Sequence, residues 1–231
     1  MNLEIPRNLK TVQQRIAETC SRRGRDPKTV RLACVTKTMS AETVRVAILA
    51  GAVLFGENYI QETREKCGIL AEYPVSWHFI GHLQTNKAKY AVKLFDLIHT
   101  VDSLHLAAEL DREARKIGKV QNILIQVNIG KEVSKSGIDA ESVDQLIRSL
   151  AVFPNLSVRG LMVIPPFFDE PERVRPYFRG LRELRDSLEK PGISLIRLDE
   201  LSMGMTGDFE AAIEEGATLV RIGTAIFGER Q

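Results

Sequence analysis

The chain has 231 residues, of which 44% are hydrophobic and 27% are charged, as in an ordinary globular protein rather than a disordered one. Its 32 Lys and Arg residues nearly balance its 30 Asp and Glu residues, so the formal net charge of +2 gives no electrostatic reason to expect a nucleic acid or a membrane surface as partner. The three cysteines are odd in number and lack metal-ligand spacing, which favours reduced thiols in a cytosol over a disulfide framework or a metal site.

The amino-terminal segment predicts a helix and no targeting signal. Four apolar residues recur in it at helical spacing, and a proline fits its first turn: Leu9, Val12, Ile16, Cys20 and Pro6. The first residues lack the apolar core of a secretory signal, and no stretch of about 18 apolar residues occurs anywhere. We therefore expect a cytoplasmic protein without a membrane span.

After this helix, short β-branched stretches alternate with longer segments of helical periodicity. The predicted strands are Val30–Val35, Ala52–Phe55, Trp77–Ile80, Phe95–Thr100, Asn122–Asn128, Val158–Ile164, Leu195–Ser202 and Thr218–Ile222. The predicted helices between them include Ala41–Ala50, Ser103–Lys116, Glu141–Leu150, Glu172–Glu189 and Phe209–Glu215. Eight strands alternating with helices predict an α/β fold, a single (β/α)8 TIM-type barrel with an extra N-terminal helix, and an open doubly wound sheet is the alternative.

No linker divides the chain, so residues 1–231 are predicted to form one domain. A local echo supports repeated βα units, because Ala47–Ala52 resembles Ala212–Ala217. In both segments a helix is expected to end at a glycine, Gly51 or Gly216, with a strand following directly.

Lys37 lies at the end of the first predicted strand, where a parallel barrel binds its ligands. Partial desolvation there would lower the pKa of the ammonium group, and the neutral amine is the form that attacks an aldehyde. Position alone still favours an ordinary surface lysine, because most lysines are exposed.

Two later loops favour a ligand-binding role for Lys37 over that of an ordinary surface lysine. The loops that start at Ser202 and at Gly223 follow the seventh and eighth predicted strands, where barrels commonly hold phosphate. Both offer hydroxyls, glycines and helix starts that suit an anion, so together they indicate a phosphorylated ligand. Arg221 shares a strand face with Gly223 and is either a phosphate clamp, a partner for a ring nitrogen, or half of a salt bridge inside the barrel.

Motifs spread over almost the whole chain resemble one family, the YggS/PROSC family of pyridoxal phosphate (PLP) homeostasis proteins. The matching segments are Cys34-Val35-Thr36-Lys37-Thr38, Phe55-Gly56-Glu57-Asn58-Tyr59, the string from Trp77 to Lys87, Gly160-Leu161-Met162, Leu201-Ser202-Met203-Gly204-Met205 and the string from Val220 to Gly228. The strings Ile80–Lys87 and Arg221–Gly228 are specific to the family, whereas a lone lysine at a strand end is not.

This resemblance implies a fold like the N-terminal barrel of alanine racemase, with PLP held as a Schiff base on Lys37. It also implies that Arg221 faces the pyridine nitrogen, and that Asn58 and Met162 line the ring pocket.

By the same resemblance, Ser202, Gly223 and Thr224 would hold the phosphate, while His82 is a weaker candidate that could equally cap the following helix. Thr206 stands where the family usually has a serine, and we expect its hydroxyl to substitute in phosphate binding. Lys135 lies in the string Ser134-Lys135-Ser136-Gly137, and we expect it to be a mobile surface lysine.

The sequence favours a PLP carrier or regulator over an enzyme. An arginine opposite the pyridine nitrogen leaves the ring unprotonated, and therefore a poorer electron sink. The racemases that this barrel resembles use a second, β-rich domain and a tyrosine base, and the chain ends at Gln231, soon after Gly228, without room for them. The expected partners are PLP and, transiently, PLP-dependent apo-enzymes. A racemase or lyase of low activity, and a PLP-free phosphosugar enzyme that uses Lys37, remain as alternatives.

Overall fold

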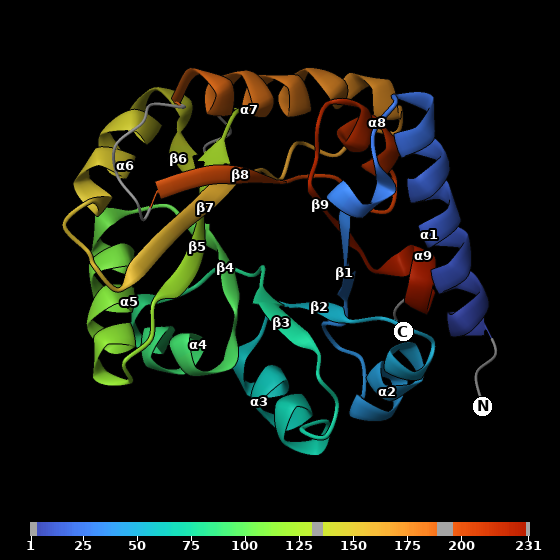
Figure 1. The fold of residues 1–231 in the computed structure, drawn as a ribbon, viewed down its shortest axis with the longest axis horizontal. Coiled ribbons are helices and arrows are strands. Elements are labelled where there is room, and N and C mark those ends of the chain that lie inside the picture. The colour runs from blue at the N-terminus through green and yellow to red at the C-terminus, as the bar shows by residue number, and fades with distance from the viewer. Residues whose placement is uncertain (1–3, 131–135, 189–195, 230–231) are drawn as a thin grey trace.

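The computed structural model describes residues 4–130, 136–188 and 196–229, and its centre is a closed barrel of parallel strands (Figure 1). The barrel strands are β1 (Arg31–Val35), β2 (Leu54–Glu57), β3 (Ser76–Phe79), β4 (Leu97–Val101), β5 (Gln121–Asn128), β7 (Leu156–Met162), β8 (Ile196–Ser202) and β9 (Leu219–Ile222). They follow one another around the ring in chain order, and β1 pairs with β9. Pairing of β4 with β5 closes the ring, which confirms the predicted barrel and excludes the open sheet.

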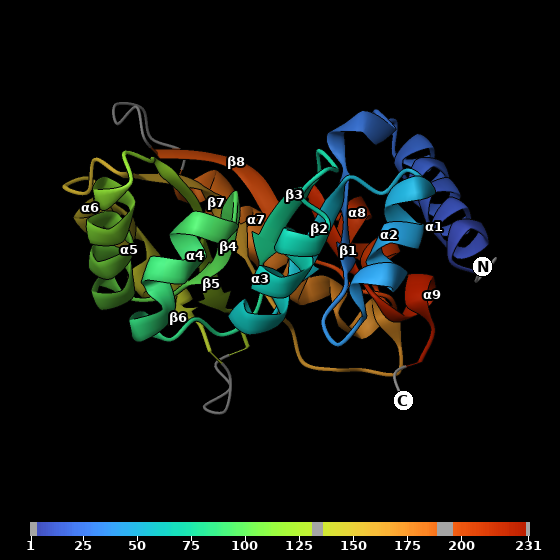
Figure 2. The same ribbon diagram turned by 90° about the horizontal axis from the view of Figure 1, so that it is seen from below.

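The helices surround this barrel (Figures 1 and 2). They are α1 (Glu4–Arg22), α2 (Ala41–Leu49), α3 (Ile60–Ile69), α4 (Ala88–Leu94), α5 (Leu104–Lys116), α6 (Val143–Leu150), α7 (Arg175–Leu188), α8 (Phe209–Glu214) and α9 (Thr224–Phe227). The six helices predicted with bounds are confirmed to within a few residues. Helix starts were also expected where α4 and the short α9 begin, whereas α3 and the two-residue strand β6 (Ile138–Asp139) were not predicted. No helix in the described ranges combines the length and the apolarity that a membrane crossing requires.

The extra N-terminal helix α1 is held against the barrel by its apolar face. Its buried residues include Ile5, Leu9, Val12 and Ile16, and the helix lies beside α8 and α9 (Figure 2). Burying one such side chain stabilises the fold by about 1.5–3 kcal/mol, so this face alone accounts for the docking. The predicted helical periodicity therefore corresponds to the face of α1 that packs against the barrel.

Two separate apolar clusters form the core. The larger one fills the space between the strands and the surrounding helices. The smaller one takes one residue from each of six barrel strands and fills the barrel interior: Ala33, Leu54, Leu97, Leu124, Met162 and Leu219. The interior is thus a packed core, as in other closed barrels, and a ligand has room only at its ends.

The predicted glycine helix ends are present. Gly51 follows α2 with a φ of 98°, and Gly216 follows α8 with a φ of 103°. After α2, the N–H groups of Gly51 and Ala52 donate to Ile48 O and Ala47 O, and the equivalent bonds recur after α8. This pair of bonds is the Schellman arrangement, in which a left-handed glycine ends the helix and turns the chain into the next strand.

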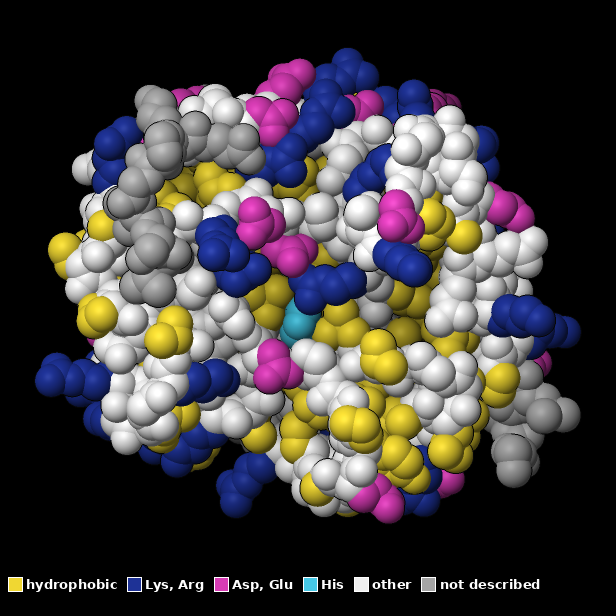
Figure 3. All heavy atoms as spheres, viewed as in Figure 1, with side chains coloured by type: hydrophobic (Ala, Val, Ile, Leu, Met, Phe, Trp, Pro, Cys, Tyr) yellow, Lys and Arg dark blue, Asp and Glu magenta, His cyan; other side chains and the backbone are white. Residues whose placement is uncertain are grey.

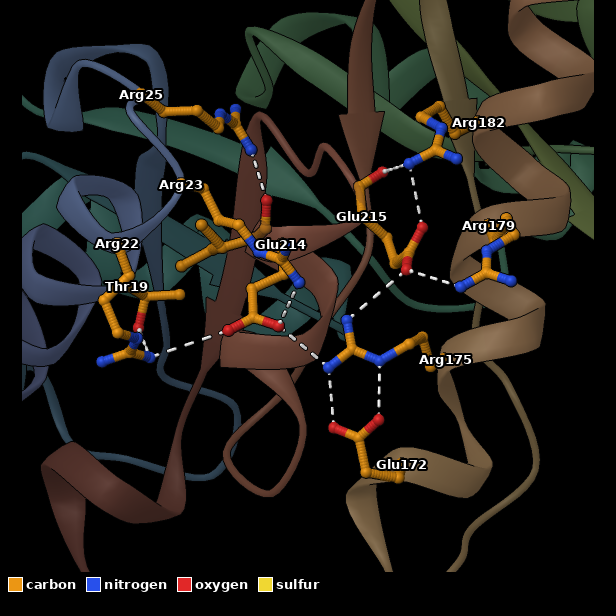
Figure 4. A network of polar contacts seen from close by, with 11 residues as sticks. Thr19, Arg22, Arg23, Arg25, Glu172, Arg175, Arg179, Arg182, Glu214 and Glu215 are labelled. Atoms are coloured by element: carbon orange, nitrogen blue, oxygen red, sulfur yellow. Dashed lines mark hydrogen bonds and ion pairs between the residues drawn. The ribbon is translucent and has the colours of Figure 1, made fainter.

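An ion-pair network ties α7 and α1 to α8 (Figure 4). The buried Glu215 carboxylate accepts from the side chains of Arg175, Arg179 and Arg182, at 2.9 to 3.4 Å. Glu214 pairs with Arg175 and reaches α1 and its following loop through two further arginines, Arg22 and Arg23. The network fixes α8 between its neighbours, and α8 directly follows the loop that lines the site described next.

Candidate functional site

A cavity of about 520 Å³ opens at the carboxyl end of the barrel. The residues that line it come directly after strands: Lys37 after β1, Asn58 after β2, Ile80 after β3, and Thr224 after β9. The segments 164–168 after β7 and 205–208 after β8 complete the wall. This is the end at which parallel barrels bind ligands, and the volume suits a small organic molecule.

Lys37 stands two residues beyond β1, half-buried on the cavity wall. The peptide groups on either side of it are held by α3. The Lys66 ammonium group donates to Thr36 O at 2.6 Å, and Thr38 N donates to a carboxylate oxygen of Glu62 at 2.8 Å. Two side chains of one helix therefore fix the backbone that carries Lys37.

Thr38 has a φ of 66°, in the left-handed region, and no other non-glycine residue in the described ranges has a positive φ. A β-branched residue rarely adopts this conformation, which costs about 1–2 kcal/mol. Strained backbone of this kind persists where neighbouring contacts enforce it, and it concentrates at functional sites. Here the bond to Glu62 enforces it, directly next to Lys37.

Below Lys37, Glu57 and Lys66 form a buried ion pair of 2.7 Å. The same Glu57 oxygen accepts from the Thr36 hydroxyl, also at 2.7 Å. Burial raises the pKa of the Glu57 carboxyl, while the hydrogen bond and charge of Lys66 oppose that shift. Glu57 lies within one of the family motifs, but the sequence did not predict this supporting role.

Arg221 forms part of the cavity floor and is only 4% exposed. Its guanidinium group donates to Ser202 Oγ at 2.6 Å and to Val163 O at 2.9 Å, both neutral oxygens. No carboxylate in the described ranges lies within ion-pair distance of it, so the predicted alternative of a barrel salt bridge finds no partner there. Burial lowers the pKa of this guanidinium to about 10, and the charge of Asp208 opposes the shift. At neutral pH the group keeps its positive charge, which is available to an anionic or electron-rich ligand.

Ser202 is fully buried and links Arg221 to two histidines. Its hydroxyl lies 2.9 Å from His99 Nδ1, and His99 Nε2 lies 3.0 Å from His78 Nδ1. Neither histidine was singled out from the sequence, because they sit in β4 and β3, far from Ser202 along the chain.

The loops after β8 and β9 supply the remaining polar groups of the cavity. Thr206 and Thr224 bring hydroxyls, and Gly207 leaves open space where a side chain would stand. The Thr206 hydroxyl also accepts a long bond of 3.4 Å from Ala225 N, which ties the two loops together. Asp208 lies beside them, but one of its oxygens is taken by Met205 N at 2.6 Å, and burial raises the pKa of its carboxyl.

Comparisons with known proteins agree with this geometry. Residues 6–231 match the family described as alanine racemase, N-terminal domain. A pyridoxal phosphate homeostasis protein of Aquifex aeolicus is 46% identical over 96% of this chain and 97% of its own. The chain belongs to the pyridoxal phosphate homeostasis protein family. The family resemblance predicted from the motifs is therefore confirmed.

Solved structures of a family member and of a more distant protein share this fold. PipY of Synechococcus elongatus, solved with PLP bound, is 38% identical, has a TM-score of 0.82, and is covered over its full length by 92% of this chain. Alanine racemase of Clostridium difficile shares the fold at 15% identity with a TM-score of 0.75, and 99% of this chain covers 57% of that enzyme.

The side chains of the cavity fit the family's cofactor. Asn58 lines the cavity, and its side-chain oxygen is buried and has no hydrogen-bond partner among the described residues. An amine, an uncompensated guanidinium group and two hydroxyls accompany it, on Lys37, Arg221, Thr206 and Thr224. This set offers one nucleophile for an aldehyde and several donors for a phosphate or a ring.

The structure brings together most, but not all, of the family site residues expected from the sequence. Five of them line the cavity: Lys37, Asn58, Arg221, Gly223 and Thr224. Ser202 and Met162 lie beneath it, because both point into the barrel, where Met162 joins the interior apolar cluster and Ser202 contacts Arg221.

Two further expectations concern the neighbouring loops. His82 is exposed and forms no helix cap; its ring lies 3.4 Å from Ser136 Oγ and lines a different cavity. Lys135 and the adjacent Ser134 lie outside the described residues.

An aromatic part of the cavity wall was missed in the sequence. Phe167 and Phe168 follow the proline pair at the end of β7, and Phe167 is 88% exposed at the rim. The two prolines were interpreted only as a strand break. A large apolar residue directly after them, at the end of a barrel where ligands bind, could have indicated a residue of the binding site.

Proposed function

We propose that this protein binds PLP reversibly, as a Schiff base on Lys37, and serves PLP homeostasis as a carrier or regulator rather than as an enzyme. The observation that carries the proposal is one cavity that joins a lysine on a clamped loop, an uncompensated buried arginine and the threonine hydroxyls. The family names and the PLP-bound PipY structure support the same conclusion.

Each wall of the cavity has a distinct task in this proposal. Lys37 supplies the amine, and bound PLP supplies an aldehyde that can be taken up and released again. Thr206 and Thr224 would donate to the phosphate together with the backbone around Gly223, and Arg221 would face the pyridine nitrogen; all four residues come from loops or strands at the cavity. Asn58 would line the ring pocket.

The cavity offers little for sustained turnover. Racemisation or elimination needs a second acid or base placed opposite the lysine. Among the described lining residues the only other ionisable group besides Arg221 is Asp208, and Met205 N already occupies one of its oxygens. This arrangement supports holding and releasing PLP, with transient contact with apo-enzymes as the route of delivery.

A transfer experiment tests this function. Protein loaded with PLP is mixed with an apo form of a PLP-dependent enzyme, and the return of that enzyme's activity is followed. Loaded wild type should restore it, and Lys37→Ala should carry no more PLP than a blank; Lys10→Ala, a change of an exposed lysine on α1, is the matched control. Failure of wild type to bind or deliver PLP refutes the carrier role, and steady conversion of an amino acid by wild type, lost in Lys37→Ala, refutes the non-enzymatic one.

A further inference from the structure

Four hydrogen-bonded side chains cross the barrel interior below the cavity. Arg221 of β9 bonds to Ser202 of β8, Ser202 to His99 of β4, and His99 to His78 of β3. All four are at most 4% exposed. The chain of hydrogen bonds therefore runs from the cavity floor through the barrel interior, which also holds the smaller apolar cluster.

The far end of this chain reaches the opposite mouth of the barrel. His78 lines a cavity of about 200 Å³ together with residues from the starts of the strands, among them Arg31, Ser76 and Asn122. Figure 3 shows a hollow on that face, with a histidine side chain inside a ring of basic and acidic side chains.

The chemistry of the four groups sets the direction of every bond in the chain. A guanidinium group only donates, so Ser202 Oγ must accept from Arg221. The buried hydroxyl proton then has one acceptor among the described residues, the bare Nδ1 of His99. A neutral His99 carries its proton on Nε2 and donates it to Nδ1 of His78, which leaves the His78 proton on Nε2.

Both histidines are neutral in this arrangement. Burial lowers the pKa of His78 to about 3, with Arg31 adding to the shift and Asp96 opposing it. Burial lowers the pKa of His99 as well, and the positive charges of Arg221 and Arg31 act in the same direction. A proton on His99 would reverse its bond to Ser202 and place a second cation next to Arg221.

The direction of the chain explains how a buried arginine keeps its charge without a carboxylate at ion-pair distance. Every donor in the chain points away from Arg221, so the negative end of each dipole faces the guanidinium group. Oriented neutral groups of this kind stabilise a cation in a low-dielectric interior, and they leave its charge uncancelled toward the cavity.

We propose that His78, His99 and Ser202 are positioning residues that hold the Arg221 guanidinium group charged and directed at the cavity floor through one directed chain of hydrogen bonds. This inference rests on the proposed PLP binding for its functional consequence. It also assigns Ser202 to Arg221 rather than to the phosphate, which leaves the hydroxyls of Thr206 and Thr224 for that role.

The first test needs no cofactor. Nitrogen-15 NMR of apo protein labelled at its four histidines reports which ring nitrogen carries the proton. His78 and His99 should both be neutral with the proton on Nε2 between pH 6 and 8; His82→Gln and His105→Gln, at exposed positions, assign the remaining signals. A proton on Nδ1 of His99, or an imidazolium at either position, overturns the proposed direction.

The second test follows PLP affinity by absorbance titration. His99→Leu removes both the acceptor and the donor, and Ser202→Ala removes the partner of Arg221, so each should weaken PLP binding by about tenfold or more. His99→Gln keeps an amide oxygen to accept and an amide N–H to donate, and should bind within about threefold of wild type. His105→Leu and His105→Gln, on exposed α5, are the matched controls.

The outcomes separate this inference from the proposed function. Unchanged affinity in folded His99→Leu and Ser202→Ala overturns it, as does a folded His99→Gln that binds as poorly as His99→Leu. If His99→Leu does not fold, the PLP affinities of Ser202→Ala and His99→Gln test the inference. Wild type that fails to bind PLP refutes the proposed function instead, while the NMR result still tests the chain of bonds.

Discussion

The loop that carries Lys37 should depend on Glu62, which lies on α3 and touches no part of the cavity surface. Glu62→Ala removes the acceptor of the Thr38 N–H group. A hydrogen bond to a charged group is worth about 1.5–3 kcal/mol, and less here because the Glu62 side chain is 33% exposed. The left-handed conformation of Thr38 costs about 1–2 kcal/mol, so the bond and the strain nearly offset each other.

Without that bond the loop should leave the binding conformation for part of the time. A loss of about 1.4 kcal/mol lowers the competent fraction, and with it the apparent PLP affinity, by about tenfold. The assay is an absorbance titration of apo protein with PLP. Glu62→Gln keeps an oxygen for the Thr38 N–H and should retain most of the affinity, and Glu65→Ala on the exposed side of the same helix is the control.

Thr38→Gly tests the strain itself. Glycine adopts a positive φ without the β-branched penalty, so this change should restore most of the affinity when added to Glu62→Ala. In the wild-type background it should have little effect. The reasoning is refuted if Glu62→Ala binds PLP like wild type, or if adding Thr38→Gly to Glu62→Ala does not raise the PLP affinity.

Three further predictions concern the groups around the cavity. Arg221→Met should weaken PLP binding while leaving the unfolding temperature of apo protein unchanged or higher, because it replaces a buried charge with an apolar chain; a large drop in that temperature contradicts this. Thr206→Ala and Thr224→Ala should each speed PLP release several-fold, seen by stopped-flow absorbance, and unchanged rates in both would remove the phosphate assignment. Lys66→Met should cost about 3–5 kcal/mol of unfolding free energy in urea at pH 7, since it leaves Glu57 buried and unpaired. The folded-state pKa of Glu57 is already raised and should rise further in this variant, so the penalty should shrink as the pH falls toward 5 and the carboxyl is protonated; a penalty that grows instead argues against this charge assignment.

The barrel could be predicted because its strands and most of its helices carry strong local signals. Apolar β-branched runs marked all eight strands, and the glycines at 51 and 216 marked two helix ends. The helix α3 escaped because its buried residues include Thr63 and Lys66, so no apolar stripe marks it. One of these polar residues, Lys66, donates to Thr36 O beside Lys37, so it supports the loop rather than an apolar stripe.

The cavity could be predicted only in part, for a similar reason. Residues directly after a strand, such as Lys37 and Thr224, are placed by the barrel geometry itself. The family resemblance assigned Ser202 to the phosphate, and its position at a strand end does not distinguish a hydroxyl that faces a ligand from one that faces the barrel interior. Its real neighbour His99 is 103 positions away along the chain, a distance that no local pattern spans.

The central claim is that Lys37 is the residue that binds PLP covalently. Protein incubated with PLP is reduced with borohydride, digested, and analysed by mass spectrometry for the pyridoxyl group. The account predicts the adduct on Lys37 in wild type and its loss in Lys37→Ala. An adduct found mainly on another lysine, or none at all, would contradict it.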